Sequence, residues 1–296
     1  FHALLETTFA SEPEWLKEKR KEAFDSFCNT GIPDRKNEEY KYTDVKRIFV
    51  GKHTSVHSES HDLKLQAEKF FVHQNSVKLI FVNGWLHKNP ALRSSVQEGV
   101  VIGNLATDLF SNKELVKEHL SEVGDALMQL NSALWTDGAL IYIPSGIKLQ
   151  QPIEIINICT GTKELLVSQR HLIKAEKNSE VSIIEQNISI DAKNSIVNSA
   201  ADIFVAENAK VQFYRVQNEC RGISQISSVN VIQEANSHFD TNTITLGTEW
   251  ARSNLNIALN GAHCESHLNG LFITGGNDHI DNHTSVQHNK PHGQSN

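Results

Sequence analysis

The chain has 296 residues, of which 39% are hydrophobic, enough for a sizeable core and for one or two domains. Its 28 Lys and Arg residues against 35 Asp and Glu give a net charge of −7, which argues against a broad basic face for nucleic acid. No segment approaches the roughly 18 consecutive apolar residues of a membrane-spanning helix, so we expect no membrane partner.

Residues 1–75 are rich in Lys and Glu and lack the alternation of strands, so they predict an N-terminal helical domain followed by a linker. Within them, the stretch 52–66 contains His53, His57 and His61 among Ser and Glu residues and shows no periodicity. This stretch is the predicted linker.

One helix has clear start and stop signals. Ser11 is the predicted N-cap, Pro13 lies in the first turn, and Glu14 completes an S-x-x-E capping box. The helix should run to about Phe27, because Gly31 stands where a C-terminal glycine stop belongs.

A β-hairpin should open the second domain. The apolar run Val77–Val82 is followed by Asn83-Gly84 and then by Trp85, and a turn of this type needs positive φ at both central residues. Residues 112–131 then show helical spacing that is broken or bent near Gly124. We expect this helical excursion to pack on the β domain.

Residues 76–296 predict a β-helix core, because between about Ile173 and Ile280 the chain repeats a polar turn followed by a short alternating strand. The predicted turn residues are Asn178, Asn208, Asn236 and Gly261, and the strands after them begin at Val181, Val211, His238 and Cys264. The interval between successive turns is nearly constant, at roughly 25 to 30 residues, which is typical of a stacked solenoid.

The chain stops at Asn296, directly after a strand-like segment and without a closing helix. A solenoid that ends in this way exposes an unpaired strand edge, so natural solenoids carry caps. We therefore expect a β-helix that is incomplete at its C-terminal end, or one whose open end is covered by something else.

The segment from Gly31 to Thr43 resembles the "G-x-P-x-x-x-x-E-x-W-K-Y-T" start of the SufB/SufD family, with Tyr40 at the usual Trp position. The run Glu39-Tyr40-Lys41-Tyr42-Thr43 and the short N-terminal region are more similar to the SufD branch than to the SufB branch. Further matches follow in family order at Asn83-Gly84, Leu130–Ala133, Asp137-Gly138, Ile143-Pro144, Pro152-Ile153, Arg170–Ile173 and Asp281–His288.

The resemblance implies a mainly β fold: a helical N-terminal domain, a right-handed parallel β-helix, and a C-terminal helical domain that docks SufC. It also implies a non-enzymatic scaffold for iron–sulfur cluster assembly, working in a hetero-oligomer with a SufB-like paralogue and a SufC-like ATPase. An iron–sulfur cluster would then be held transiently in the complex, and no cofactor by this chain alone. The family's cluster-forming histidine lies beyond these residues, so no site is carried over.

Cys264 and His267 form the one alternative metal pair. Cys264 stands between His263 and Glu265, and a thiolate with an imidazole could hold iron or a cluster. Neighbouring residues on a strand point to opposite faces, so structural packing of Cys264 is favoured. We therefore expect no metal, cofactor or catalytic residue in this chain.

The other cysteines are interpreted as packing residues. No C-x-x-C pair occurs, which predicts neither a disulfide framework nor a zinc site and favours a reducing cytoplasm. Cys28 lies near Phe24 and Phe27 on the apolar face of the predicted helix, and Cys159 and Cys220 have no clustered ligands.

Histidines 279, 283, 288 and 292 include i, i+4 spacings, which place ligands together only on a helix. Asn282, Asn289, Pro291 and Gly293 make a helix improbable there. On a strand, four residues separate side chains by about 13 Å, too far to share one ion. These histidines are therefore expected to be turn and rung residues.

Two rival functions stay open. A carbohydrate-active β-helix enzyme would use paired carboxylates, and Asp240, Glu249 and Asp278 are available, but nothing spaces them as a pair. A purely structural or adaptor solenoid differs from a cluster scaffold only in its partners. Nucleotide hydrolysis by this chain is not expected, because no G-x-x-x-x-G-K-[ST] loop occurs.

Overall fold

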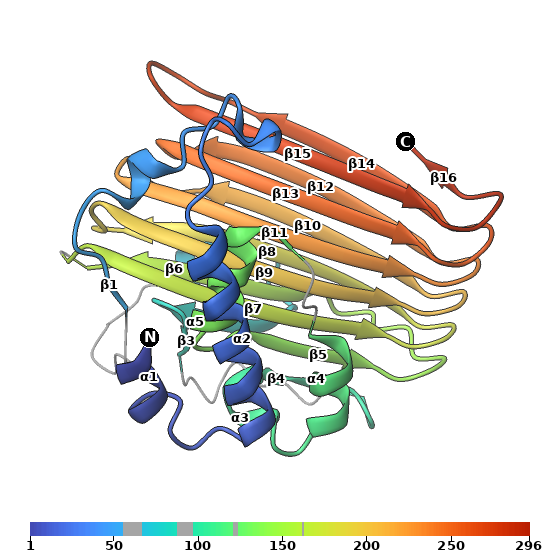
Figure 1. The fold of residues 1–296 in the computed structure, drawn as a ribbon. Coiled ribbons are helices and arrows are strands. Elements are labelled where there is room, and N and C mark those ends of the chain that lie inside the picture. Colours follow the sequence, from blue (N-terminus) through green and yellow to red (C-terminus); the bar gives the residue numbers. More distant parts are fainter. Residues whose placement is uncertain (56–66, 88–96, 121–123, 162) are drawn as a thin grey trace.

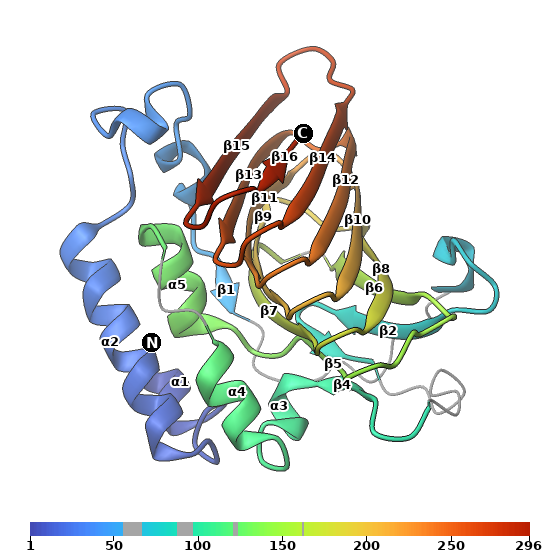
Figure 2. The ribbon, with the colours of Figure 1, turned by 90° about the vertical axis from the view of Figure 1, so that its right-hand side faces the viewer.

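The computed structural model describes residues 1–296 except 56–66, 88–96, 121–123 and 162. From residue 139 onward the chain winds into a β-solenoid of about five turns, with two long sheets facing each other (Figure 1). The N-terminal helices lie outside one of the two sheets and leave the other uncovered at β10, β12 and β14 (Figure 2). The predicted mainly β solenoid with a helical N-terminal region is confirmed.

The two sheets, here called sheet A and sheet B, take alternate strands of the chain. Sheet A contains β1 (Thr54–Ser55), β4 (Val101–Asn104), β5 (Ala139–Ile143), β7 (Leu165–Ala175), β9 (Ser195–Val205), β11 (Ile223–Gln233), β13 (Trp250–Leu259) and β15 (His279–His288). Sheet B contains β2 (Val77–Val82), β3 (Trp85–Leu86), β6 (Ile153–Thr160), β8 (Glu180–Ile190), β10 (Lys210–Asn218), β12 (His238–Gly247), β14 (Glu265–Phe272) and β16 (Gln294–Ser295).

The strands predicted from the repeat are those of sheet B. Lys210 pairs with Glu180 on one side and with His238 on the other, and His238 pairs with Glu265, all in parallel. Successive coils therefore stack in register, as the constant step predicted. The long sheet A strands were not located one by one, although strands were expected from Ala139 onward. β9, for example, is buried on both faces and lacks the alternation that marks β10.

The left-handed turn residues confirm three of the four predicted positions. Asn178, Asn208 and Asn236 have φ of 60°, 58° and 57°. The fourth predicted residue, Gly261, does lie in its turn, but the left-handed residue equivalent to those asparagines is His263, with φ of 58°. Gly261 serves a different need: a Cβ there would lie 1.9 Å from the backbone nitrogen of Ala235 in the preceding coil.

The N-terminal helix starts later than its capping signal predicts. The helix α2 spans Glu14–Thr30, with Pro13 as the N-cap residue and no side-chain cap, so the assignment of Ser11 was wrong. A residue before proline avoids the α conformation, so Glu12 cannot be the first helical residue after Ser11. The end of the helix is as predicted, with Gly31 at φ of 72° just after it.

Four other helices complete the region outside sheet A: α1 (His2–Glu6), α3 (Leu105–Asp108), α4 (Lys113–His119) and α5 (Ala126–Leu134). The predicted excursion at 112–131 is helical, divided into α4 and α5 with Gly124 between them. α5 is anchored on sheet A through Asn131, whose Nδ2 donates to the backbone oxygens of Gln169 and Asn198. Among the described residues, three short 3-10 helices lie at Glu38–Tyr40, Lys46–Phe49 and Ala67–Phe70.

The predicted hairpin is confirmed, with Phe81 opposite Leu86 in antiparallel β2 and β3. Most of the predicted linker at 52–66 lies outside the described residues. At its start, Thr54 and Ser55 form β1 and pair in parallel with Leu165 and Leu166.

Candidate functional site

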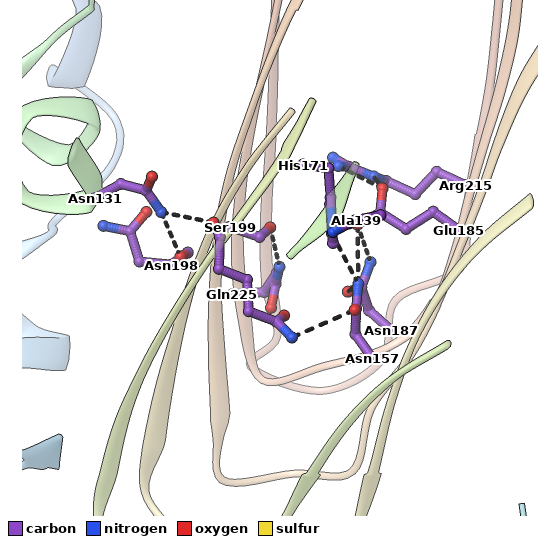
Figure 3. A network of polar contacts seen from close by, with 11 residues as sticks. Asn131, Ala139, Asn157, His171, Glu185, Asn187, Asn198, Ser199, Arg215 and Gln225 are labelled. Carbon is purple, nitrogen blue, oxygen red and sulfur yellow. Dashed lines mark hydrogen bonds and ion pairs between the residues drawn. The ribbon is translucent and has the colours of Figure 1, made fainter. Parts of the chain in front are cut away.

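A belt of polar side chains crosses the interior of the β-helix between two apolar clusters (Figure 3). Its members come from strands of the two sheets and from the corner that follows β10. We call this set the polar belt: Asn157, Gln169, His171, Glu185, Asn187, Ser199, Arg215, Gln217, Glu219 and Gln225. Each member is at most 5% exposed, so these groups must satisfy one another.

Glu185 and Arg215 form the ion pair of the polar belt. Nε and NH2 of Arg215 lie 2.8 and 2.7 Å from Oε2 of Glu185. The two residues pair in register on β8 and β10, so the contact follows from stacking of neighbouring coils. Burial alone would raise the pKa of Glu185, but the Arg215 guanidinium holds that pKa below its usual value.

His171 is neutral. Its Nδ1 accepts a hydrogen bond of 2.9 Å from the backbone N–H of Ala139, so the ring proton is on Nε2. Nε2 faces Oε1 of Glu185 at 3.9 Å. Complete burial lowers the pKa of His171 to about 4, in agreement with a ring that must accept rather than donate at Nδ1.

Amide side chains complete the coordination of the buried carboxylate. Asn157 donates from Nδ2 to Oε1 of Glu185 at 3.2 Å and to Oδ1 of Asn187 at 3.0 Å. Gln169 then donates to Oδ1 of Asn157 at 3.3 Å, which continues the chain of contacts into sheet A. The result is a connected polar path between the two sheets.

Two further ionisable groups lie beside this path. Burial raises the pKa of Glu219 to about 7, so this carboxyl is partly protonated near neutral pH. Burial also raises the pKa of the Cys159 thiol to about 12, which leaves almost no thiolate at neutral pH. Cys159 is thus an inert interior thiol, as predicted for a packing residue.

The polar belt can hold one buried negative charge, accept a proton at Glu219 and exclude bulk water. It presents no nucleophile beside a free base, because the imidazole acceptor of His171 is already used by Ala139. Across the described part of the chain, no three His, Cys, Asp or Glu side chains gather as metal ligands.

Cys264 and His267, the alternative metal pair, are placed on opposite sides of the sheet B wall. Cys264 is fully buried in the apolar interior, where its thiol contacts the backbone oxygens of Gly261 and Glu234 at 3.1 Å. His267 is half exposed on the outer face of β14 and bonds Asp240 from the neighbouring coil. The structure does not bring the two side chains together.

Two other cysteine predictions were wrong. Cys28 is exposed, because it follows Phe27 by about 100° around α2 and so leaves the buried face. Cys220 is also exposed; it lies in the corner after β10, where its thiol contacts Ser189 at 3.0 Å.

The C-terminal histidines lie on a strand and in a turn, as predicted. His279, His283 and His288 belong to β15. His292 is a left-handed turn residue whose ring stacks on that of His263 at 4.8 Å between centroids. Stacking of coils, rather than spacing along the chain, thus brings histidines together.

The three carboxylates considered for carbohydrate chemistry have separate surroundings. Asp240 contacts His267, and Asp278 lies 3.4 Å from Arg221. Glu249 lies between β12 and β13, where its backbone oxygen accepts from His279. This arrangement does not favour a paired-carboxylate enzyme.

The polar belt was missed from the sequence, although a signal exists. Asn157, Asn187 and Gln217 follow one another at a constant step, and the same step separates Glu185 from Arg215. Polar residues at the same inward position of successive repeats therefore marked the belt. They were overlooked because inward positions of a solenoid are expected to be apolar.

The chain matches two family descriptions. Residues 1–155 match the SufBD protein N-terminal region, and residues 158–296 match the SufBD core domain of SUF system FeS cluster assembly. Among the described residues, no helix is long and apolar enough to cross a bilayer.

Similar proteins from other organisms support the same family assignment. The chain is 24% identical to an iron–sulfur cluster assembly SufBD family protein of Synechocystis, covering 97% of this chain and 66% of the relative. It is 26% identical to the iron–sulfur cluster assembly protein SufD of Bacillus subtilis, over 72% of this chain and 51% of that protein. It is 18% identical to the iron–sulfur cluster assembly protein SufB of the same organism, over 96% of this chain and 64% of that protein.

The chain spans between 51% and 66% of the length of these relatives. Both family descriptions together cover nearly all of it, and most of the parallel β-helix, from β7 onward, lies under the core match. The chain therefore belongs to the SufBD family of SUF system iron–sulfur cluster assembly proteins, and it is SufD-like.

Proposed function

We propose that the protein containing this chain is a non-enzymatic scaffold subunit of a SufBCD-type iron–sulfur cluster assembly complex in the cytoplasm. Its partners would be a SufB-like paralogue and a SufC-like ATPase that supplies ATP hydrolysis. A cluster would be held transiently by the complex rather than by this chain alone. Membership of the SufBD family is the observation that carries this proposal.

The solenoid supports a docking role. Sheets A and B end in β15 and β16, whose outer edges carry backbone groups that can pair with another strand. Beside them, Leu271, Phe272 and Ile273 are 55%, 58% and 59% exposed. Further coils of the same protein, or a paralogous solenoid, would bury these apolar side chains and pair the strand edges.

The division into a helical domain with linker at 1–75 and a β-helix core at 76–296 also stays a proposal. It is supported by the change from helices to strands, although β1 pairs with β7 across that boundary.

The test is co-purification. The full-length protein should be isolated under anaerobic conditions with its SufB and SufC homologues co-expressed, and all three should elute as one complex. A variant with Leu271 and Ile273 changed to Ser measures whether the exposed apolar edge contributes. If the full-length protein elutes alone while the other two subunits remain folded, the scaffold proposal fails.

A further inference from the structure

The outer face of sheet B carries four metal-ligating side chains at the start of two neighbouring strands. β12 begins His238-Phe239-Asp240, and β14 begins Glu265-Ser266-His267. Side chains two residues apart on a strand share a face, so all four polar side chains point outward. Phe239 and Ser266 between them point into the interior and are buried.

Register brings the four side chains into two contacts between coils. His238 pairs in register with Glu265, and Asp240 with His267. Nδ1 of His238 lies 3.1 Å from Oε2 of Glu265, and Nδ1 of His267 lies 2.7 Å from Oδ1 of Asp240. Imidazole and carboxylate thus alternate at the corners of a rectangle about 4.8 Å across the strands and about 6.6 Å along them.

We propose that these four side chains form a binding site for one divalent transition-metal ion of the Zn²⁺ type. Two imidazoles and two carboxylates are a donor set that borderline ions such as Zn²⁺ and Co²⁺ accept. Ligand bonds of about 2.0 to 2.2 Å place neighbouring tetrahedral donors roughly 3.3 to 3.6 Å apart. Each His–carboxylate pair is already close to that separation.

Binding requires the exposed side chains to rotate towards one another. Within the described residues no three such donors already converge on one point, so the ion must draw the two pairs together. The side chains of His238, Glu265 and His267 are 43%, 44% and 50% exposed, and that of Asp240 is 23% exposed. An ion can therefore reach them from solvent, because the α-helices lie over the other sheet and β12 and β14 are uncovered (Figure 2).

The site differs from the pair suggested by the sequence. His267 remains a candidate ligand, but its partners come from the preceding coil and do not include Cys264, which is buried. The inference does not depend on the proposed scaffold role, because it rests on these four donors alone. A failed co-purification would leave it unaffected.

The test is a cobalt titration of the full-length protein, purified without a polyhistidine tag. Co²⁺ gives visible absorption when it enters a site of low coordination number, and Zn²⁺ should displace it. We expect one equivalent to bind at micromolar concentration. Changing His238 and His267 together to Asn should weaken binding by at least about tenfold, the lower limit for losing even an outer-shell group. Asp240→Asn with Glu265→Gln should weaken it comparably.

The matched control is the other exposed histidine cluster. His263 and His292 stack on successive coils, and changing both to Asn, a residue that tolerates their left-handed turns, should leave cobalt binding unchanged. Circular dichroism confirms that each variant is folded. The proposal is overturned if the protein binds no stoichiometric cobalt, if the His238 and His267 variant binds it as the wild type does, or if only the His263 and His292 variant loses it.

Discussion

The backbone N–H of Ala139 donates a hydrogen bond of 2.9 Å to Nδ1 of His171. This contact joins β5 to the polar belt and requires a neutral imidazole, because a protonated ring has no acceptor. The polar belt is therefore built for one state of charge: Glu185 ionised, Arg215 protonated and His171 neutral.

The first prediction concerns pH. The pKa of His171 is about 4 in the folded chain and about 6.5 when unfolded, so the unfolded state binds more protons between these values. The stability contributed by neutral His171 is complete above pH 6.5 and is lost as pH falls towards 4, by roughly 3 kcal/mol. His171→Gln, whose side chain does not titrate, should lack this loss in urea unfolding measured across that range.

Glu219 acts in the opposite sense, because its raised pKa makes the folded state bind more protons as the solution approaches neutrality. Glu219 is present in both proteins. Subtracting the pH profile of unfolding free energy of His171→Gln from that of the wild type therefore cancels the contribution of Glu219. A difference profile that is flat from pH 4 to 6.5 contradicts the assignment of neutral His171.

The second prediction concerns the buried ion pair. Arg215→Met removes the cation beside a carboxylate that is completely buried, and we expect a loss of about 3 to 5 kcal/mol in unfolding free energy. Adding Glu185→Gln should recover part of that loss. The control is Arg221→Met, an arginine that is 73% exposed beside Asp278 and should cost about 1 kcal/mol or less. Equal losses for the two arginine variants would argue against the ion pair.

The third prediction concerns the column of left-handed turns. Asn208 has φ of 58°, so Asn208→Gly should change stability little, whereas Asn208→Val should cost about 1 to 3 kcal/mol. Thermal unfolding measures both. Asn269→Val, at an exposed outward position of β14, is the control and should be nearly neutral. If Val is tolerated at both positions, the turn does not require its left-handed residue.

The fourth prediction concerns docking of α2. Arg20 is completely buried between the rings of Phe9 and Trp135, and it donates to both carboxylate oxygens of Glu12 at 2.7 Å. Arg20→Met should leave Glu12 unpaired and release the N-terminal helices from the solenoid. Hydrogen exchange should show lost protection in α2 with retained protection in β9 and β11.

Lys21→Met is the matched control for this fourth change, since the Lys21 side chain is 49% exposed and 3.8 Å from Glu14. Uniform loss of protection through the β-helix would show that the helices and the solenoid unfold as one unit. Unchanged exchange in α2 would show that Arg20 does not hold it.

Errors in prediction from the sequence have a common physical origin. Gly261 was taken as the repeat equivalent of the turn asparagines, but that position falls on His263, and Gly261 is needed for close approach to Ala235 in the preceding coil. Cys28 was placed in the core from its neighbours along the helix, but the direction of its side chain decided otherwise. In both cases the outcome depended on how the segment packs against residues far away in sequence.

The candidate sites show the same limit. Asn157, Asn187 and Gln217 recur at the step of the repeat, so the existence of inward polar positions was available in the sequence. The sequence did not show that these residues meet a neutral His171 from the opposite sheet, because no spacing along the chain relates β6 to β7 across the interior. His267 was paired with Cys264 in the sequence analysis, but its contact in the structure is Asp240 of the neighbouring coil, and Cys264 is buried on the other face.

The amino-acid sequence by itself determined the coil: asparagines at a nearly constant step set the turns, and alternation set the inward and outward faces of sheet B. Only the tertiary structure decided which side chains meet, because in a parallel β-helix each residue contacts the residue one coil away and the sheet across the interior. Those contacts depend on the register between successive coils, whose lengths differ, and they pair Glu185 with Arg215 and Asp240 with His267.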